Sequence, residues 1–260
     1  MTTISAKVIE DSISTKGKRL TTLELYYPRF IHQQLLTHRM FSRSSSSSRA
    51  IPIDRVIEEI ENNPVIPIEW GLNKAGMQAE GVLSDDRYAK SKWMDACRNA
   101  IAIARDLQAV GLHKQIVNRI LEPFAHIKTL VTATEWDNFF ELRLDKHAQP
   151  EIQELARQMK QAMIKSQPVQ KNVHTPYLTD VERKDDNTFR MKMISAARCA
   201  RVSYKTHIGE YPNQGKDYDL AVRLRSSKHF SPFEHVAEAG ERDERYRNFV
   251  GWKQLRISLD

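Results

Sequence analysis

The stretch Thr37-His38-Arg39-Met40-Phe41-Ser42-Arg43 is followed directly by five serines, Ser44 to Ser48, and then by Arg49. Guanidinium groups bind phosphate through paired N–H donors, and serine hydroxyls and loop N–H groups add short donors around the same anion. The stretch is therefore a candidate cradle for the phosphate of a nucleotide. On composition alone, a flexible and basic serine-rich linker is an equally good interpretation.

The segments before this stretch have regular patterns, which favour the cradle over the linker. Apolar residues alternate with polar ones over residues 23–27, which predicts a half-buried strand that Pro28 closes. Apolar side chains then recur at helical spacing over residues 30–38, so Pro28 is expected to precede a short helix. The serine tract thus follows folded elements.

The remainder of the chain alternates helical and strand patterns, so we expect an α+β fold. Helices are predicted over residues 85–111, 116–120, 152–163, 191–200 and 217–226, and a strand over 127–132. Thr134, with Asp137 three residues later, predicts the N-terminal cap of a helix that buries aromatic side chains. These are Trp136, Phe139 and Phe140. Residues 168–187 are expected to form a loop or lid, and residues 209–215 to join the last two helices.

Composition restricts the partners and the location. The 40 Lys+Arg against 33 Asp+Glu give a formal charge of +7, which favours anionic partners such as nucleotides and nucleic acids. Cys97 and Cys199 lie far apart without metal-ligand spacing, so neither a disulfide framework nor a metal site is expected. No apolar run approaches the roughly 18 residues of a membrane span, and we expect a cytoplasmic protein, in the host cytoplasm if its source is viral.

Several common catalytic and nucleotide-binding motifs are absent from the sequence. The nine glycines never form G-x-G-x-x-G, and no glycine-rich phosphate loop with its following Lys-Ser/Thr occurs. H-E-x-x-H and G-x-S-x-G are missing as well. Any nucleotide must therefore be held in another way.

The stretch from Thr37 to Arg49 resembles the signature R-H-R-x-x-S-x-N-E-x-S-x-R of the flavin-dependent thymidylate synthases. The residues that match are His38, Arg39, Ser42, Ser47 and Arg49. Thr37 replaces the first arginine of the signature, and Ser44 and Ser45 replace its asparagine and glutamate. The resemblance implies that Gln34, Ser47 and Arg49 bind the substrate, and that His38, Arg39 and Ser42 bind flavin. Because an unassisted serine hydroxyl is a weak nucleophile, the catalytic role expected of Ser47 is orientation.

A second segment, Asn138 to Gln149, resembles the N-x-x-x-L-R-x-x-x-H-A-Q helix of the same family. The resemblance implies that Asn138 lies near the flavin and that Arg143 acts at the uracil edge, as a substrate-binding and catalytic residue. Arg119 resembles a family arginine that binds the substrate phosphate. Taken by itself, the second segment is better explained as an exposed helix rim opposite the face of Trp136 and Phe140.

A third resemblance joins Ala200-Arg201-Val202-Ser203-Tyr204 to His229-Phe230-Ser231-Pro232-Phe233-Glu234-His235. These strings are similar to the A-R-V-S and H-x-S/T-P-F-E-H motifs of the family, which contact flavin. The residues that inherit this role are Ser203, His229, Ser231 and Glu234, and His229 also becomes a catalytic candidate. His235, beside proline and phenylalanine, is expected to be structural.

The order of the segments differs from that of the family, in which S-P-F-E-H precedes R-H-R. We therefore expect a circularly permuted, phage-like member with a central antiparallel sheet, flanking helices and one domain over residues 1–260. Its signature segments would be 23–51, 112–163 and 191–240.

The resemblance implies FAD as cofactor, NADPH and methylenetetrahydrofolate as cosubstrates, dUMP as substrate, dTMP as product and a homotetramer. Two alternatives remain open. The same flavin chemistry could give another product such as 5-hydroxymethyl-dUMP, because the signature differs at Thr37, Ser44 and Ser45. A basic nucleic-acid-binding protein is the alternative of another class, although aromatic residues are not interleaved with the arginines of the serine tract.

Overall fold

The structure is a computed structural model that describes residues 2–76, 78–184, 188–204 and 213–259, with the backbone alone for Ser203 and Tyr204. Its central element is a five-stranded sheet in the order β3-β4-β2-β1-β5. The strands are β1 Ser5–Ile13, β2 Arg19–Pro28, β3 Ser42–Ser45, β4 His126–Ala133 and β5 Val169–Gln170. All neighbours pair antiparallel except β1 and β5, which are parallel. The prediction of a largely antiparallel sheet within an α+β fold is confirmed.

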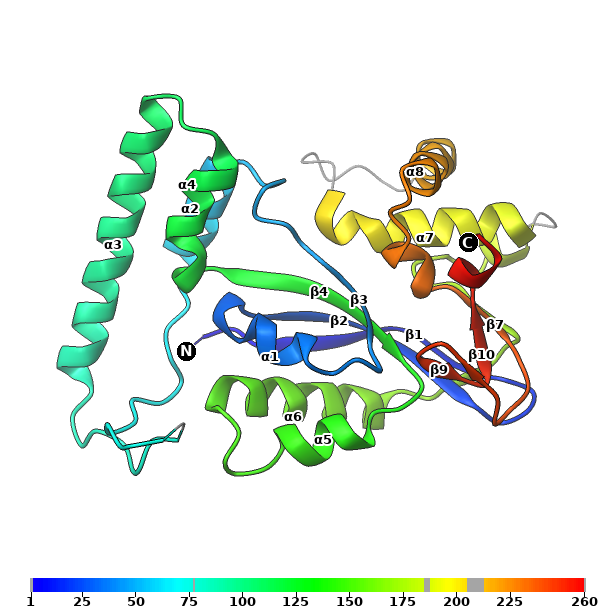
Figure 1. The fold of residues 1–260 in the computed structure, drawn as a ribbon, viewed down its shortest axis with the longest axis horizontal. Helices are drawn as coiled ribbons and strands as arrows, with labels where there is room; N and C mark the ends of the chain where they lie inside the picture. The colour runs from blue at the N-terminus through cyan, green and yellow to red at the C-terminus, as the bar shows by residue number, and fades with distance from the viewer. Residues whose placement is uncertain (1, 77, 185–187, 205–212, 260) are drawn as a thin grey trace.

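One face of this sheet packs against three helices that belong mainly to the first two signature segments, 23–51 and 112–163 (Figure 1). They are α1 His32–Leu36, α5 Asp137–Arg143 and α6 Pro150–Lys165, and the short turn η1 Arg29–Ile31 precedes α1. The alternate apolar residues of β2 and β4 point into this core, which explains the period-two pattern of residues 23–27. The apolar face of α6 covers them, as its helical periodicity predicts.

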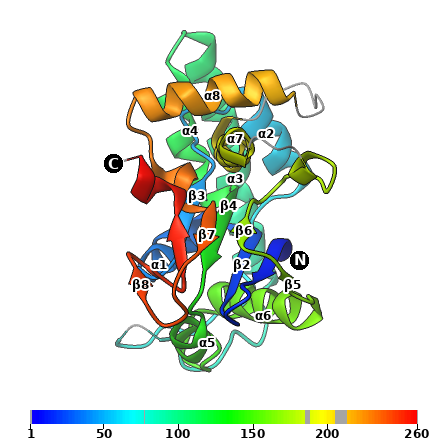
Figure 2. The same cartoon turned by 90° about the vertical axis from the view of Figure 1, so that its right-hand side faces the viewer.

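The opposite face is covered by the carboxy-terminal third of the chain. Helix α7 Thr188–Tyr204 lies on the sheet, and α8 Gln214–Ser226 lies across α7 (Figure 2). A smaller sheet of β6 Val173–His174, β7 Ala237–Ala239 and β10 Trp252–Gln254 stands beside them, with a hairpin of β8 Arg245–Tyr246 and β9 Phe249–Val250. Single turns η3 Glu182–Lys184, η4 Ser231–Glu234 and η5 Leu255–Ser258 connect these elements.

A cluster of three helices projects from one end of the sheet (Figure 1). It consists of α2 Ile53–Asn62, α3 Arg87–Ala109 and α4 Lys114–Leu121, and the turn η2 Glu122–Phe124 leads from α4 to β4. Helix α3 has the predicted bounds to within two residues, and the face predicted to pack does so through Cys97, Ala100 and Ala104. Among the helices of the described ranges, none is long and apolar enough to cross a membrane.

Three local predictions need correction. Thr134 does not cap α5, because its hydroxyl accepts a hydrogen bond from the backbone N of Val250 at 3.0 Å and Trp136 takes the cap position instead. Phe140 is half-buried rather than buried. Residues 168–187 include the short strands β5 and β6, because their backbone pairs with β1 and β7. Most of the predicted connection 209–215 lies outside the described residues.

Candidate functional site

The side chains of His38 and Arg143 meet where the loop after α1 approaches the end of α5. The His38 ring lies against Phe41 and Phe139, with ring centroids 5.8 and 4.8 Å away. Its Nε2 accepts a hydrogen bond of 2.9 Å from Nε of Arg143. Burial first, and then the charges of Arg143 and Arg43, lower the pKa of His38 to about 4. His38 is therefore neutral at physiological pH and acts as an acceptor that orients the guanidinium.

Three further groups surround the same guanidinium. Its NH2 donates to the carbonyl of Gln34 at 3.3 Å and to Oγ1 of Thr37 at 3.2 Å. The amide of Gln34 in turn donates to the side chain of Gln149, just before α6. We call Gln34, Thr37, His38 and Arg143 the arginine cluster. It joins the first two predicted segments, and it includes Thr37, which stands where the family signature has an arginine.

The first part of the serine tract is a strand, so a wholly flexible linker is a wrong description of it. In β3, Ser42 and Ser44 point to the α7 face of the sheet and are buried. Oγ of Ser42 accepts hydrogen bonds from Asn248 at 3.0 Å and Gln254 at 2.9 Å. Oγ of Ser44 is hydrogen-bonded to Nε2 of His235 at 3.0 Å. The third predicted segment therefore packs directly on the first.

Ser44 ends a continuous line of buried hydrogen bonds that crosses the sheet, which we call the buried chain. Its members, in order, are Ser44, His235, Thr132, Thr22, His174 and Ser12. The four links after the Ser44–His235 bond measure 2.8, 2.7, 2.7 and 2.8 Å. Burial lowers the pKa of His235 to about 3 and that of His174 well below its usual value. Both rings are thus neutral and bonded at both nitrogens, in agreement with a structural role for His235.

Ser45 points to the other face of β3 and joins a shorter line. Its hydroxyl accepts from Thr129 at 3.0 Å, and Thr129 is bonded to the Tyr27 hydroxyl at 2.8 Å. That hydroxyl is bonded to His32 at 2.7 Å. The serines that replace the family's asparagine and glutamate are therefore both engaged inside the protein.

Beyond β3, the tract reaches a set of charged side chains at the end of α4. Ser48 donates to Glu122 at 2.9 Å, and the same carboxylate pairs with Arg119 at 2.8 Å and with Arg29 at 3.1 Å. Arg119 is exposed, as is Arg49 beside Ser48. The structure thus brings Arg119 to the end of the serine tract, where Arg49 also lies.

The remaining predicted residues differ in exposure. Glu234 is half-buried and pairs with Arg256. Burial lowers the pKa of Arg43 while the negative charge of Glu234 opposes that shift, so these two groups also interact. The exposed candidates are Arg39, Asn138, Ser231 and His229, whose Nδ1 is bonded to Ser227. Ser47 is half-buried, and the side chain of Ser203 lies outside the described residues.

The two amide side chains that hydrogen-bond to Ser42 of β3 could not be predicted from the sequence. They belong to Asn248 and Gln254, which lie near the carboxy terminus and outside the predicted motifs. The burial of Thr22 and Thr132 could not be read from alternation, because the same faces of their strands carry charged side chains such as Glu24 and Lys128. Within the part of the chain that the structure describes, no group of three or more His, Cys, Asp or Glu side chains is arranged to hold a metal ion.

The family model described as "thymidylate synthase complementing protein" matches residues 20–169. The flavin-dependent thymidylate synthase of Pyrococcus furiosus is 31% identical over 134 residues, covering 51% of this chain and 49% of that protein. The corresponding protein of Thermosipho africanus is 26% identical over 141 residues, covering 52% and 59%. The chain therefore spans about half the length of the curated relatives it matches.

Solved structures share this fold over part of the chain. The UMP/dUMP methylase PolB from Streptomyces cacaoi, bound with 5-Br dUMP, superposes with a TM-score of 0.51 at 18% identity. The match covers 64% of this chain and 91% of the methylase. A second structure of the methylase, bound with 5-Br UMP, gives a TM-score of 0.53.

Proposed function

Because the chain belongs to the thymidylate synthase complementing protein family, we propose that it transfers a one-carbon unit from methylenetetrahydrofolate to C5 of dUMP, giving dTMP. The observation that carries this proposal is the convergence of three distant segments. His38 of the first bonds to Arg143 of the second, and Ser44 of the first bonds to His235 of the third. The names of the flavin-dependent relatives and of the methylase support a flavin and a uridine nucleotide.

Arg143 is the residue assigned to the uracil ring. A cation fixed at the ring edge stabilises the negative charge that develops as C5 becomes nucleophilic. Neutral His38 accepts from Nε of Arg143, and Thr37 accepts from its NH2 group. Other N–H donors of the same guanidinium are left for the substrate. Arg49, Ser47 and Arg119 bind the phosphate, with Ser47 orienting the nucleotide, and Gln34 completes the substrate site.

The donors assigned to FAD fit its oxygen-rich edges, because exposed arginine, asparagine, histidine and serine side chains all donate hydrogen bonds. They are Arg39, Asn138, His229 and Ser231, with His38, Ser42, Glu234 and Ser203 as further assigned positions. His38 and Ser42 are buried and already bonded, so their contribution is to shape the site. When bound and reduced by NADPH, FAD supplies the redox and methylene-transfer chemistry.

The permuted order belongs to the same proposal. The family model ends at residue 169, whereas the third segment packs on β3 from the carboxy-terminal part of the chain. In the family's order, the third segment precedes the first. Since η5 and the start of β1 lie far apart in Figure 1, a chain in that order would need a linking segment between these two places. Sites shared between the subunits of a homotetramer would ease such a rearrangement.

A second product, 5-hydroxymethyl-dUMP, is favoured by one observation. The hydroxyls of Ser44 and Ser45 are engaged in internal hydrogen bonds, and Thr37 is bonded to Gln34. The three replaced positions thus offer the substrate no charged group, and they differ from the family where the substrate binds.

Absorbance and product mass test the proposal. Purified protein is expected to show a flavin spectrum, and incubation with dUMP, methylenetetrahydrofolate and NADPH to yield a product of dTMP mass. A hydroxymethyl product would replace dTMP in the proposal, and a colourless protein that binds nucleic acid but neither FAD nor dUMP would refute both. Arg49→Ala should lose activity with flavin retained.

A further inference from the structure

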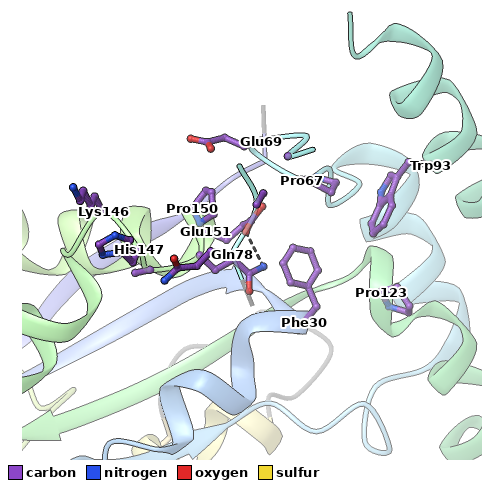
Figure 3. A pocket seen from close by; sticks show the side chains of 14 residues that line it. Phe30, Pro67, Glu69, Gln78, Trp93, Pro123, Lys146, His147, Pro150 and Glu151 are labelled. Carbon is purple, nitrogen blue, oxygen red and sulfur yellow. Dashed lines mark hydrogen bonds between the residues drawn. The ribbon is translucent and has the colours of Figure 1, made fainter. Parts of the chain in front are cut away.

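A pocket of about 580 Å³ lies beside the arginine cluster, between η1, α3 and the start of α6 (Figure 3). Figure 3 shows the rings of Phe30 and Trp93 on one side of the pocket and Lys146 and His147 on the other, with Glu151 between them. The volume suits a drug-sized molecule, and the pocket combines apolar walls with a few polar groups, as small-molecule sites do.

The carboxylate of Glu151 is the polar feature that most restricts the ligand. Glu151 is only 3% exposed. Its Oε1 accepts from the backbone N of Ile68 and its Oε2 from the amide of Gln149, each at 2.9 Å. Within the described ranges, no Lys, Arg or His forms an ion pair with it. Because each carboxylate oxygen has about two lone-pair sites, both oxygens retain acceptor capacity for a ligand.

A buried carboxylate without a cation is costly unless donors surround it, so this wall of the pocket favours N–H groups over carbonyl oxygens. Two adjacent N–H donors match the two oxygens of one carboxylate best. The flat rings of Phe30 and Trp93 favour a planar ligand, since aromatic groups pack face to face or edge to face. The cation of Lys146 favours a negatively charged tail on the ligand.

From these features we infer that the pocket binds a bicyclic ring with a 2-amino-4-oxopyrimidine edge, as in a pterin or a guanine, attached to an anionic tail. That edge presents a ring N–H beside an amino N–H, and both point at Glu151. Adenine presents an acceptor in place of the ring N–H, and a uracil or flavin edge presents carbonyls. The carboxylate therefore selects against these rings through unfavourable acceptor contacts.

The pocket also connects to the arginine cluster. The side chain of Gln149 donates to Glu151 and accepts from the side-chain amide of Gln34. The backbone carbonyl of Gln34 accepts from Arg143. A ring that displaces the Gln149 amide from Glu151 thus acts on the Gln34 side chain. If the ring is a pterin, the pocket holds the folate near the uracil site, and this last step rests on the proposed function.

Calorimetric titration of the purified full chain with folic acid, GMP and AMP tests the inference without an activity measurement. One of the first two ligands should bind, and AMP should bind at least tenfold more weakly. Glu151→Gln keeps the acceptor for Ile68 and should weaken the bound ligand at least tenfold. The matched control Glu141→Gln, an exposed position on α5, should change nothing.

Two further variants test the aromatic wall and the cationic side of the pocket. Trp93→Leu should weaken binding severalfold, and Lys146→Ala should weaken folic acid more than 6-methylpterin, which has the ring without the anionic tail. Thermal melts identify any variant that fails to fold, and Trp93→Leu then serves in place of Glu151→Gln.

Binding of folic acid alone identifies a pterin, and binding of GMP alone a guanine. Equal binding of AMP, no binding of either ligand, or unchanged affinity in Glu151→Gln and Trp93→Leu would overturn the inference. Because no turnover is measured, a protein that binds the ring but makes no dTMP contradicts only the proposed function. A protein that makes dTMP without binding at Glu151 contradicts only the pocket.

Discussion

The arginine cluster and the buried chain both contain a histidine with a depressed pKa, yet the two regions serve different ends. His38 is neutral because of burial and of two nearby arginines, whereas His235 is neutral through burial alone. Every partner in the buried chain is a hydroxyl or an imidazole, so the chain carries no charge. The cluster instead holds a guanidinium that is half-exposed. Burial with neutral partners gives rigidity, and a charge held at the surface gives a group that can act on a ligand.

The largest expected effect concerns the arginine cluster. Arg143→Ala should lower kcat/KM for dTMP formation about 100-fold or more, because it removes a preorganised cation worth about 3 kcal/mol in the transition state. The free energy of unfolding should change by less than about 1 kcal/mol, since the side chain is half-exposed. Steady-state kinetics and urea unfolding measure the two quantities. Arg143→Lys should restore little, because an ammonium lacks the planar fork. A large loss of stability would show that the cluster is structural like the buried chain.

The second effect concerns stability. His235→Leu leaves the hydroxyls of Ser44 and Thr132 short of a partner inside the protein, at about 1–3 kcal/mol for each unsatisfied group. We expect the free energy of unfolding to fall by about 3 kcal/mol in urea titrations. His229→Leu, at an exposed position of the same motif, is the control and should cost less than about 0.5 kcal/mol. Equal losses in both variants would contradict the distinction between the regions.

The third effect is a dependence of stability on pH. A buried histidine with a folded pKa of about 3 stays neutral while the unfolded chain, with a pKa near 6.5, takes up a proton. The stability is therefore complete above about pH 6.5 and declines as the pH falls toward 3, by about 1.4 kcal/mol per pH unit for each such histidine. His235→Asn should make the slope between pH 6 and pH 4 shallower by about that amount. An unchanged slope in unfolding curves would mean that His235 titrates normally.

The smallest expected effect on stability is that of removing one hydroxyl group, either buried or exposed. Ser44→Ala should reduce the free energy of unfolding by about 1 kcal/mol, the net value of one buried hydrogen bond. Ser231→Ala, at an exposed position, should stay within about 0.5 kcal/mol. Paired unfolding curves of the two variants give the comparison, and a silent Ser44→Ala would place that hydroxyl outside the buried chain.

Much of the fold could be predicted from periodicity. The bounds of α3 and β4, and the apolar face of α6, follow from side-chain patterns that burial imposes on single elements. The cap at Thr134 failed because a distant residue, Val250, took its hydroxyl. The serine tract had two interpretations, a phosphate cradle and a flexible linker, because serine is common in loops and its hydroxyl also binds anions. Pairing of Ser42–Ser45 with β4 shows that the tract is not wholly flexible, and the phosphate cradle stays a prediction.

The sequence by itself determined the family, through motifs whose residues recur at fixed spacing, and it determined which side chains carry charge. Only the tertiary structure decided that Arg143 binds neutral His38 and that Ser44 faces His235 rather than a ligand. It also brought Glu151 to the same pocket as Phe30 and Trp93. The physical reason is distance along the chain. Local patterns report the burial of one helix or strand, whereas a hydrogen-bond partner more than 100 residues away is fixed only when the layers pack.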